Sequence, residues 1–346
     1  EFEFFVVTRN CDFLESEPYT GIIQHKWQIL SEGENIYYLP EKDVSGKLYK
    51  QLVKEVQPDA VYVNGVYSWK FSILPLLVLK RLNYRNRILL GTYGMLAPAA
   101  IHIKGWKKRL FISVARIVGL YKQVVFHATS NQEERDIKVV FGDSQRILRA
   151  PHLPAKDFPP IREIMKERGV LKLISVARIS PEKNTLFALK VLSEVKNCQI
   201  LFDLYGPKYD VEYWTNCQRS IGRLPSNVTV NYKGVAEGGR VLELISGYHA
   251  LFMPTRGENF GYAILESFMA GRPVIISDQT PWKNLIEKNA GFDLPLEKLQ
   301  QFVEKIENLA DMTQTTFDNL CRGAHNEAIG FVEDPELRAA NRGLFL

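Results

Sequence analysis

The chain has 346 residues, of which 46% are hydrophobic and 24% charged, and its formal net charge is +5. This composition excludes a collagen, a coiled-coil rod, a disordered chain and a small disulfide scaffold, and a prior of about 150 residues per domain predicts two domains. The four cysteines lie far apart with no Cys-x-x-Cys spacing. They indicate a reducing compartment, so we expect a cytoplasmic protein.

No stretch of the sequence is typical of a membrane span. The longest apolar run, Phe71 to Leu79, contains Ser72 and Pro75 and is far shorter than the roughly 20 residues required. The opening residues include Glu1 and Glu3, which is not typical of a signal peptide. We therefore expect a soluble protein, or one attached to a membrane only at its surface.

The first half of the chain alternates short β-type runs with helical patterns, which predicts βαβ units around a parallel sheet. The expected strands are 2–7, 35–39, 60–64, 87–91 and 123–128, and the expected helices are 46–57, 69–82, 105–121 and 130–141. A proline-rich connector, 151–163, then interrupts the pattern. Proline restricts its own backbone and that of the preceding residue, so this connector predicts a domain boundary.

The second half repeats the same alternation. The expected strands are 171–177, 199–206, 228–234, 250–255 and 273–277, and the expected helices lie near 182–195, 211–222, 237–247, 261–270 and 281–288. The tail from 296 to 346 is expected to be helical. The fold class predicted is therefore α/β, with two Rossmann-like domains facing a cleft and a helical C-terminal tail. We place the domains at 1–155 and 160–330, with a C-terminal helix at 331–346 that packs back on the first domain.

The most informative stretch is 254–277, where a buried strand is followed by a polar loop and a helix. Phe260 and Gly261 open this helix, whose first amides have no internal acceptors and carry the positive end of the helix dipole. Such a helix start is suited to an anion, and glycine lets a phosphate approach the backbone. Glu258 precedes the helix and Glu266 lies inside it, so the two carboxylates can hold different parts of one extended ligand. Either glutamate alone would also suit an ordinary surface position.

A second motif lies at 175–192. Arg178 follows a predicted strand and Lys183 begins the next helical pattern. Two cations at the carboxyl end of a sheet suit a diphosphate, although each alone would also suit a solvated loop. Gly206 and Val235 lie at or just after the ends of two further strands and would bring backbone to the same edge.

Taken together, these motifs resemble the donor-binding half of the group 1 retaining nucleotide-sugar glycosyltransferases, which have the GT-B fold. The resemblance implies that 160–330 is the nucleotide-sugar-binding domain and 1–155 the acceptor-binding domain. It implies that Arg178, Lys183 and Glu258 are catalytic, with the two cations on the donor diphosphate and Glu258 on the donor sugar. Glu266 would hold the ribose hydroxyls. The resemblance further assigns donor binding to Gly206, Val235, Asn259, Phe260, Gly261, Tyr262 and Ile264.

The N-terminal half resembles family members that build surface polysaccharides such as lipopolysaccharide or capsule. It differs in having no glycine before Gly21, where the family usually has a strand and a Gly-Gly loop, so we expect this domain either to start late or to lack its first strand. On the acceptor side, the resemblance points to Asn64, Tyr93, Gly94 and His127.

The resemblance implies transfer of a hexose from a UDP- or GDP-sugar to a hydroxyl of a glycan or lipid-linked saccharide, with retention. Cations and helix amides aimed at the leaving diphosphate stabilise its negative charge, so we expect no cofactor and no metal. No Asp-x-Asp motif occurs in the chain, and its histidines lack metal-ligand spacing. Two alternatives remain open at this point, a nucleotide-sugar epimerase of the same fold and a non-catalytic nucleotide-sugar-binding subunit.

Between Asp59 and Glu133 there are 11 basic residues and no acidic one. Within this stretch an aromatic residue and several cations begin a helical pattern: Lys104, Trp106, Lys107, Lys108 and Arg109. The pattern suits an anionic membrane surface, and it also suits a plain solvated helix. It lacks the aromatic pattern of an RNA-binding module, so we expect no nucleic acid partner.

Overall fold

The structure is a computed structural model that describes residues 2–12, 16–98, 101, 105–153 and 160–346. The chain forms two compact units, Glu1–Ala150 with Ala340–Leu346, and Pro151–Ala339. The division after Ala150 falls where the proline-rich connector begins. Each unit is described by itself below.

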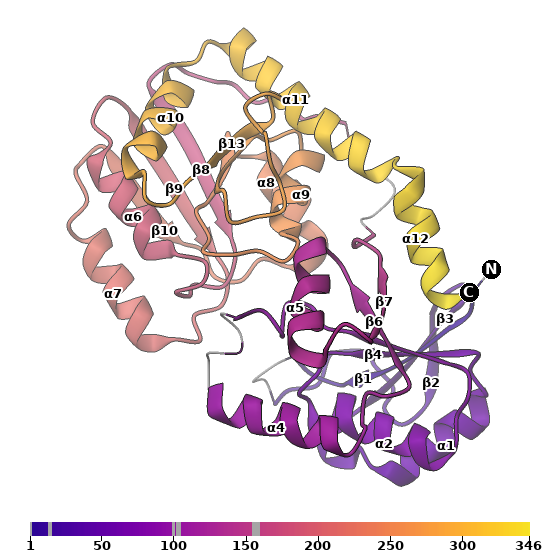
Figure 1. The fold of residues 1–346 in the computed structure, drawn as a ribbon. Helices are drawn as coiled ribbons and strands as arrows, with labels where there is room; N and C mark the ends of the chain where they lie inside the picture. The colour runs from indigo at the N-terminus through magenta and orange to yellow at the C-terminus, as the bar shows by residue number, and fades with distance from the viewer. Residues whose placement is uncertain (1, 13–15, 99–100, 102–104, 154–159) are drawn as a thin grey trace. The chain divides into compact units, whose positions relative to one another are not determined.

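The strands of the first unit form two sheets (Figure 1). In one, β1 (Phe4–Arg9) pairs with β3 (Glu34–Leu39) in parallel, and β3 pairs with β2 (Trp27–Ser31) in antiparallel. The other is fully parallel, in the order β4 (Ala60–Asn64), β5 (Arg87–Gly91), β6 (Val124–Ala128) and β7 (Arg146–Arg149). The five predicted strands are confirmed to within three residues at each end, whereas β2 and β7 were not predicted.

Helices pack against both sheets of the first unit, the first helix mainly against β3 and the others mainly against the parallel sheet. They are α1 (Gly46–Val56), α2 (Leu74–Arg81), α4 (Gly105–Ile117) and α5 (Asn131–Phe141), with a π-helical turn η2 (Trp69–Ile73) before α2 and a short 3-10 turn η1 (Glu41–Asp43). Apolar residues of α2, α4 and α5 pack with those of β5 and β6 in one buried core. On the other face, the end of the C-terminal helix α12 (Pro335–Phe345) packs Leu344 against Leu89.

A cavity of about 350 Å³ lies between the two sheets of the first unit. Residues of β1 and β4 line it, together with apolar residues of α1 and α2. Among the described residues, β1 pairs only with β3, and β4 pairs only with β5. The prediction of a missing first strand stays a prediction.

The second unit contains one six-stranded sheet in which every pair is parallel. Its strands are, in spatial order, β10 (Val228–Tyr232), β9 (Gln199–Tyr205), β8 (Val170–Val176), β11 (Ala250–Met253), β12 (Val274–Ser277) and β13 (Gly291–Leu294). In chain order this is 3-2-1-4-5-6, the order of a doubly wound Rossmann sheet, and its direction of progression reverses between β8 and β11.

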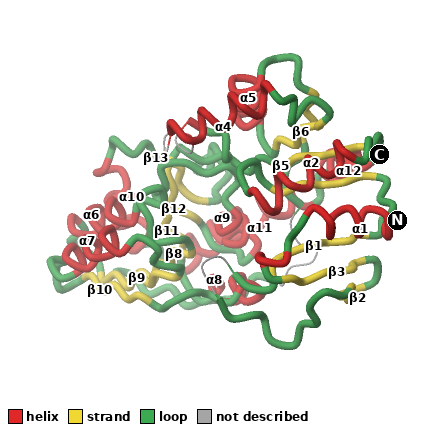
Figure 2. Tube along the Cα trace, turned by 90° about the horizontal axis from the view of Figure 1, so that it is seen from below, coloured by secondary structure: helices red, strands yellow, loops and turns green. Residues whose placement is uncertain are grey.

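Helices lie on both faces of this sheet (Figure 2). One core holds α6 (Thr185–Glu194), α7 (Val211–Ile221) and α10 (Leu299–Asp311), and the other holds α8 (Val241–Ser246) and α9 (Tyr262–Met269). The long helix α11 (Gln314–Val332) contributes to both cores, and the 3-10 turn η3 (Gly238–Arg240) precedes α8. Successive residues of β11, such as Leu251 and Phe252, enter opposite cores, because side chains alternate along a strand. The predicted helical tail is confirmed.

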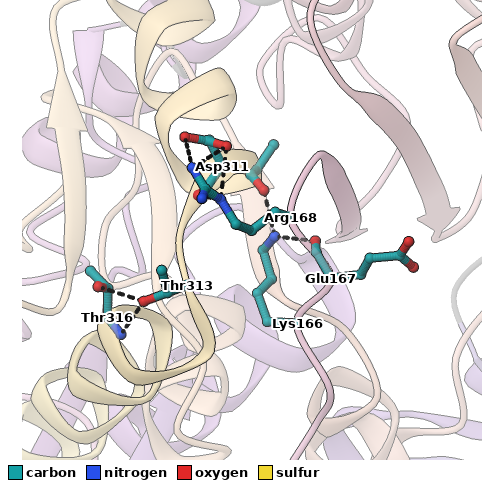
Figure 3. Close-up of polar contacts among 7 residues, drawn as sticks. Lys166, Glu167, Arg168, Asp311, Thr313 and Thr316 are labelled. Atoms are coloured by element: carbon teal, nitrogen blue, oxygen red, sulfur yellow. Dashed lines mark hydrogen bonds and ion pairs between the residues drawn. The ribbon is translucent and has the colours of Figure 1, made fainter.

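A polar cluster ties the segment before β8 to the corner between α10 and α11 (Figure 3). The Lys166 ammonium donates to the carbonyls of Glu167 and Ala310, and the Arg168 guanidinium forms an ion pair with Asp311 at 2.8 Å. Thr313 caps α11 by accepting from the amide of Thr316. These contacts close the helical tail onto the start of the sheet, at the edge opposite the strand carboxyl ends.

One predicted helix is wrong. Residues 281–288 form turns, because Asn284 and Asn289 have left-handed backbones with φ of 58° and 52°. The Asp293 carboxylate accepts from the amides of Asn284 and Leu285, at 3.1 and 2.9 Å, and so replaces helical acceptors. The local spacing of apolar residues predicted a helix, because it carries no information about the Asp293 carboxylate of the later strand β13.

Candidate functional site

The candidate site lies where the strand order of the second sheet reverses. Ligands in such sheets bind outside the carboxyl ends of the strands, at this switch point. The loops that follow β8 and β11 start there, and they carry most of the residues that the sequence singled out.

Backbone contacts join these two loops directly. The carbonyl of Glu182 accepts from the Arg256 amide at 2.8 Å and from the Thr255 hydroxyl at 3.0 Å. The buried side chain of Asn184 donates to the Pro254 carbonyl at 3.0 Å. Asn184 also caps α6 with a left-handed backbone at φ 60°, so α6 begins at Thr185 and the loop before it is fixed in place.

Lys183 and Glu258 form an ion pair between the two loops. Only 20% of the Lys183 side chain and 9% of the Glu258 side chain are exposed. The amide of Glu258 donates to the Gln279 carbonyl at 3.0 Å, so the loop after β12 also holds this residue. The structure thus brings together two of the three predicted catalytic residues.

Arg178 follows β8, and its side chain is exposed. The adjacent Ala177 amide donates to the Tyr205 carbonyl, and the Ile179 amide donates to the Pro207 carbonyl. A β-carbon on Gly206 would lie 1.9 Å from the Ala177 carbonyl oxygen, and Gly206 has φ +145°. Glycine is therefore required at 206, because only a residue without a side chain lets β9 pass so close to the backbone of the Arg178 loop.

The helix α9 begins at the predicted position. Gly261 is its N-cap with φ +84°, and the buried Phe260 accepts a hydrogen bond at its carbonyl from the Trp282 indole at 2.7 Å. The Ile264 amide donates to the Gly261 carbonyl at 3.0 Å. The amide of Ile264, which the family resemblance assigned to donor binding, is thus engaged within the first turn of the helix.

An aromatic cluster flanks the start of α9. The His152 ring lies 5.2 Å from the Phe260 ring and 4.9 Å from the Tyr262 ring, measured between centroids. Asn259 lies half-buried just before these residues. No sequence pattern indicated a role for His152, because it lies in the connector, far along the chain from α9.

Glu266 lies one turn further along α9. Burial raises the pKa of its carboxyl to about 7, and no described residue forms a hydrogen bond or ion pair with it in the structure. Burial therefore favours the protonated form of this carboxyl more than solvent would. A carboxyl whose pKa is shifted by burial at the edge of such a sheet is a candidate functional group.

Val235 lies on the wall of a cavity of about 480 Å³ and is 66% exposed. Tyr205 and Tyr248 also line this cavity. Beneath it, the buried Asp203 carboxylate accepts from the Tyr248 hydroxyl at 2.7 Å and from the Asn231 amide nitrogen at 2.8 Å. Sequence reasoning missed this support, although an aspartate inside the predicted strand 199–206 was a signal that could have indicated it.

The predicted acceptor-side residues lie in the first unit, at the carboxyl ends of β4, β5 and β6. Asn64 ends β4 and is exposed, while Tyr93 and Gly94 follow β5 and His127 is buried in β6. The Gly94 amide donates to the Glu133 carboxylate at 2.7 Å. The Tyr62 hydroxyl bonds both the Tyr93 hydroxyl and His127 Nδ1, at 2.8 and 2.5 Å. Tyr62 was not predicted.

The predicted basic segment forms α4, except that Lys104 lies outside the described residues. Its buried face includes Ile112 and Ala115. Its outer face carries a row of exposed apolar side chains at helical spacing: Trp106, Leu110, Val114 and Ile117. Among the helices that the structure describes, none combines the length and apolar character needed to cross a bilayer.

Three or more histidine, cysteine, aspartate or glutamate side chains do not gather into a metal-binding group anywhere in the described ranges. The expectation of a metal-free, cofactor-free site stays a prediction.

Comparison with protein-family models matches residues 159–319 to the family described as glycosyl transferases group 1. This range contains the predicted donor-side residues. Comparison with curated proteins finds no significant sequence match.

Solved structures resemble the chain over nearly its whole length. A sucrose-phosphate synthase from Thermosynechococcus elongatus aligns with a TM-score of 0.72 and 14% identity, over 99% of this chain and 88% of the other. A glycosyltransferase from Rickettsia africae aligns with a TM-score of 0.65 and 15% identity, over 90% and 84%. HepE from Anabaena, solved with UDP and glucose, aligns with a TM-score of 0.62 and 14% identity, over 89% of this chain and 84% of the other. These likenesses establish the fold, and the predicted GT-B fold is confirmed.

Proposed function

We propose that this chain, whose residues 159–319 match the group 1 glycosyltransferase family, transfers a hexose from a UDP- or GDP-sugar to a sugar hydroxyl. The acceptor in this proposal is a glycan or a lipid-linked saccharide of surface polysaccharide biosynthesis, such as lipopolysaccharide or capsule. The observation that carries the proposal is the Lys183–Glu258 ion pair at the switch point, one short loop before the start of α9. Binding of UDP and glucose by HepE, which has a similar fold, supports a nucleotide-sugar donor.

In this proposal the donor diphosphate lies between the cations of Arg178 and Lys183 and the first turn of α9. Arginine offers a forked pair of donors, lysine a compact charge, and the helix start a partial positive charge. Glu258 then holds the donor sugar, Glu266 the ribose hydroxyls, and Val235 one side of the base. The first-turn amides that precede the engaged Ile264 amide serve the diphosphate.

The charge placement suggests how transfer proceeds. Cleavage of the bond between sugar and diphosphate leaves negative charge on the departing diphosphate. Preorganised donors aimed at such charge contribute about 3–4 kcal/mol each to lowering the barrier. With two side-chain cations and a helix start at this place, we propose that no metal is required. The acceptor hydroxyl attacks the face from which the diphosphate leaves, with retention of configuration.

Thermal stabilisation by a panel of UDP- and GDP-hexoses tests donor binding, since a ligand at 100 times its Kd stabilises the folded state by about 2.7 kcal/mol. Each stabilising donor is then incubated with methyl hexopyranosides, and mass spectrometry detects the disaccharide product. Formation of the disaccharide supports the proposed transfer, and the coupling constant of its new anomeric proton in NMR shows whether the configuration is retained. Conversion of the donor sugar without acceptor would identify an epimerase instead, and tight binding without turnover would identify a binding subunit.

We also propose that α4 docks the protein on the cytoplasmic face of an anionic membrane. The exposed apolar row of α4 is flanked by Lys107 on one side and by Arg109 and Arg116 on the other, since residues advance by 100° along a helix. Apolar insertion together with cationic flanks is the pattern of an interfacial helix. Lys108 instead lies over the Tyr67 ring, at 5.1 Å from its centroid.

Co-sedimentation with vesicles tests this docking. The wild type should bind vesicles that contain phosphatidylglycerol and bind pure phosphatidylcholine vesicles weakly. Ile117→Ser should reduce the binding several-fold, because Ile117 is 84% exposed and lies in the apolar row. Val139→Ser is the matched control, since Val139 of α5 is 85% exposed but lies outside that row. Equal binding by both variants would contradict the assignment.

A further inference from the structure

Three rings of the first unit form a directional chain of hydrogen bonds. His127 Nε2 lies 2.7 Å from the Ala150 carbonyl oxygen, and Nδ1 lies 2.5 Å from the Tyr62 hydroxyl. The Tyr62 hydroxyl lies 2.8 Å from that of Tyr93. A carbonyl oxygen can only accept, so His127 carries its proton on Nε2, and Nδ1 of the neutral ring accepts from Tyr62.

The remaining direction follows from this tautomer. The Tyr62 hydroxyl has one proton, which it donates to His127, so it accepts the proton of Tyr93. Tyr93 is thereby turned so that its own proton points inward and its oxygen lone pairs face away from Tyr62. Tyr93 is 37% exposed, whereas His127 is buried.

The backbone around Tyr93 is built to hold this arrangement. Tyr93 has φ +46°, in the left-handed region, which costs an aromatic residue about 1–2 kcal/mol. Glu133 secures the strained turn by accepting from the Thr92 hydroxyl and the Gly94 amide, at 2.5 and 2.7 Å. A β-carbon on Gly91 would lie 2.3 Å from the Tyr62 hydroxyl oxygen and 2.5 Å from the Tyr93 ring, so glycine makes room for both phenols. Strained residues that their surroundings hold in place are typical of functional sites.

We propose that Tyr93 binds a hydroxyl of the sugar acceptor by accepting its hydrogen bond, and that Tyr62 and His127 are positioning residues that fix this direction. This inference rests on the proposed transferase function and deepens it. A site that can only accept selects ligands that donate at that point, because an analogue lacking the donor leaves a polar group unpaired.

The charged and titratable groups around His127 fit a neutral ring. Tyr62 faces it from β4, Tyr93 from the loop after β5, and Glu133 from α5, while β7 places Leu148 opposite it. Burial lowers the pKa of His127 below its usual 6.5, against smaller raising effects of the Ala150 carbonyl and Glu133. Protonation at lower pH makes Nδ1 a donor, which reverses the chain and turns the Tyr93 proton outward.

Fluorinated acceptors test the direction of the hydrogen bond, because a C–F group cannot donate. The probes are the methyl hexopyranoside used by the wild type and its monodeoxyfluoro analogues, with acceptor KM and kcat/KM measured at pH 7.5. At one acceptor position that takes no part in the reaction, replacing the hydroxyl with fluorine should lower kcat/KM of the wild type about tenfold. Tyr93→Phe should use both acceptors alike, and Tyr62→Phe should show an intermediate preference. In the wild type, the preference for the hydroxyl should shrink as the pH falls below 6.5, and in Tyr62→Phe it should not change with pH.

Tyr84→Phe is the matched control, because the Tyr84 hydroxyl also donates a hydrogen bond, to the Pro58 carbonyl at 2.7 Å, but is not a member of this chain of rings. Thermal stabilisation by the donor shows whether each variant is folded. A wild type that binds no donor and transfers no sugar would overturn the proposed function. A transferring wild type whose preference for the hydroxyl persists in Tyr93→Phe would overturn this inference alone.

Discussion

The side chains of Lys183 and Glu258 form an ion pair that joins the loops after β8 and β11. The two residues are 75 positions apart in the chain. They meet because parallel strands end at one edge of the sheet and because β8 and β11 are neighbours at the switch point. In the proposed function, this charge pair exchanges its partners with a diphosphate and a sugar.

Removing one partner should separate the structural role of this pair from its role in transfer. Lys183→Met leaves the Glu258 carboxylate without its cation, which should cost about 1–3 kcal/mol of the free energy of unfolding. It should also lower kcat of sugar transfer about 10²–10³-fold, through loss of one donor to the leaving diphosphate. Glu258→Gln should likewise lose transfer while the fold survives. Urea unfolding and initial rates measure the two effects.

Lys190→Met is the control, because Lys190 is an exposed lysine on α6. Its free energy of unfolding should stay within about 0.5 kcal/mol of the wild type. The double variant Lys183→Met/Glu258→Gln should recover stability but not transfer. Full activity in either purified single variant would refute the assignment of both residues.

Gly206→Ala should damage the Arg178 loop. The new methyl group would lie 1.9 Å from the Ala177 carbonyl oxygen, so the loop or β9 must move. Gly234→Ala separates this effect from backbone strain, because Gly234 also has positive φ, at +89°, but no heavy atom lies within 4 Å of the added carbon. We expect Gly234→Ala to lower the free energy of unfolding by about 1–2 kcal/mol and Gly206→Ala to lower it clearly more. Gly206→Ala should also bind the donor more weakly in calorimetry. Equal costs would show that the close approach is unimportant.

Glu266 should make stability and donor binding depend on pH near neutrality. Its pKa is raised from 4.5 to about 7 in the folded state, so the folded chain binds the extra proton. Its contribution to stability is therefore fully present below pH 4.5 and is lost as the pH rises through about 7, by at most about 3 kcal/mol. Denaturant unfolding of the wild type and Glu266→Gln across this range should diverge, whereas exposed Glu297→Gln should follow the wild type.

The same carboxyl should couple donor binding to proton release. An ionised carboxylate accepts from ribose hydroxyls better than the protonated acid. Titration calorimetry in buffers of different ionisation enthalpy should therefore detect a proton released on donor binding near pH 6.5. This release should vanish in Glu266→Gln. Its persistence there would assign the proton to another group.

Sequence periodicity predicted most of the fold, because the buried strands are short apolar runs between turn residues. The strand β11, for example, is buried throughout, and Pro254 follows it directly. Periodicity failed where distant residues decide the structure. The turns at 281–288 depend on Asp293, and β13 begins at Gly291, which is atypical of a strand.

The candidate site was predictable where residues of one loop act together, as in Glu258 to Gly261. Partners from distant segments were not. His152 reaches the start of α9 from the connector, and Tyr62 reaches His127 from another strand. Both depend on tertiary packing of rings, which leaves no periodic pattern in the sequence.

Glu133 tests whether a buried carboxylate maintains the turn that carries Tyr93. Burial alone would raise the pKa of Glu133, but hydrogen bonds from the Thr129 and Gly94 amides and from two threonine hydroxyls hold it below its usual 4.5. This contribution to stability is therefore present above pH 4.5 and is lost as the pH falls through the lowered pKa. Glu133→Gln places the amide nitrogen of glutamine, a donor, opposite groups that also donate. It should therefore lower the free energy of unfolding by about 2–3 kcal/mol.

Glu134→Gln is the matched control, because the adjacent Glu134 forms a partly exposed ion pair with Lys138 one helical turn away, and such pairs near the surface are worth about 0–1 kcal/mol. Urea unfolding between pH 3 and 8 should show a steep loss of stability at acid pH in the wild type and in Glu134→Gln. Glu133→Gln should be less stable at neutral pH and flatter toward acid. It should also lose the acceptor preference that Tyr93 provides, because the strained turn relaxes without the carboxylate. A Glu133→Gln protein with unchanged acid sensitivity would show that another group holds this turn.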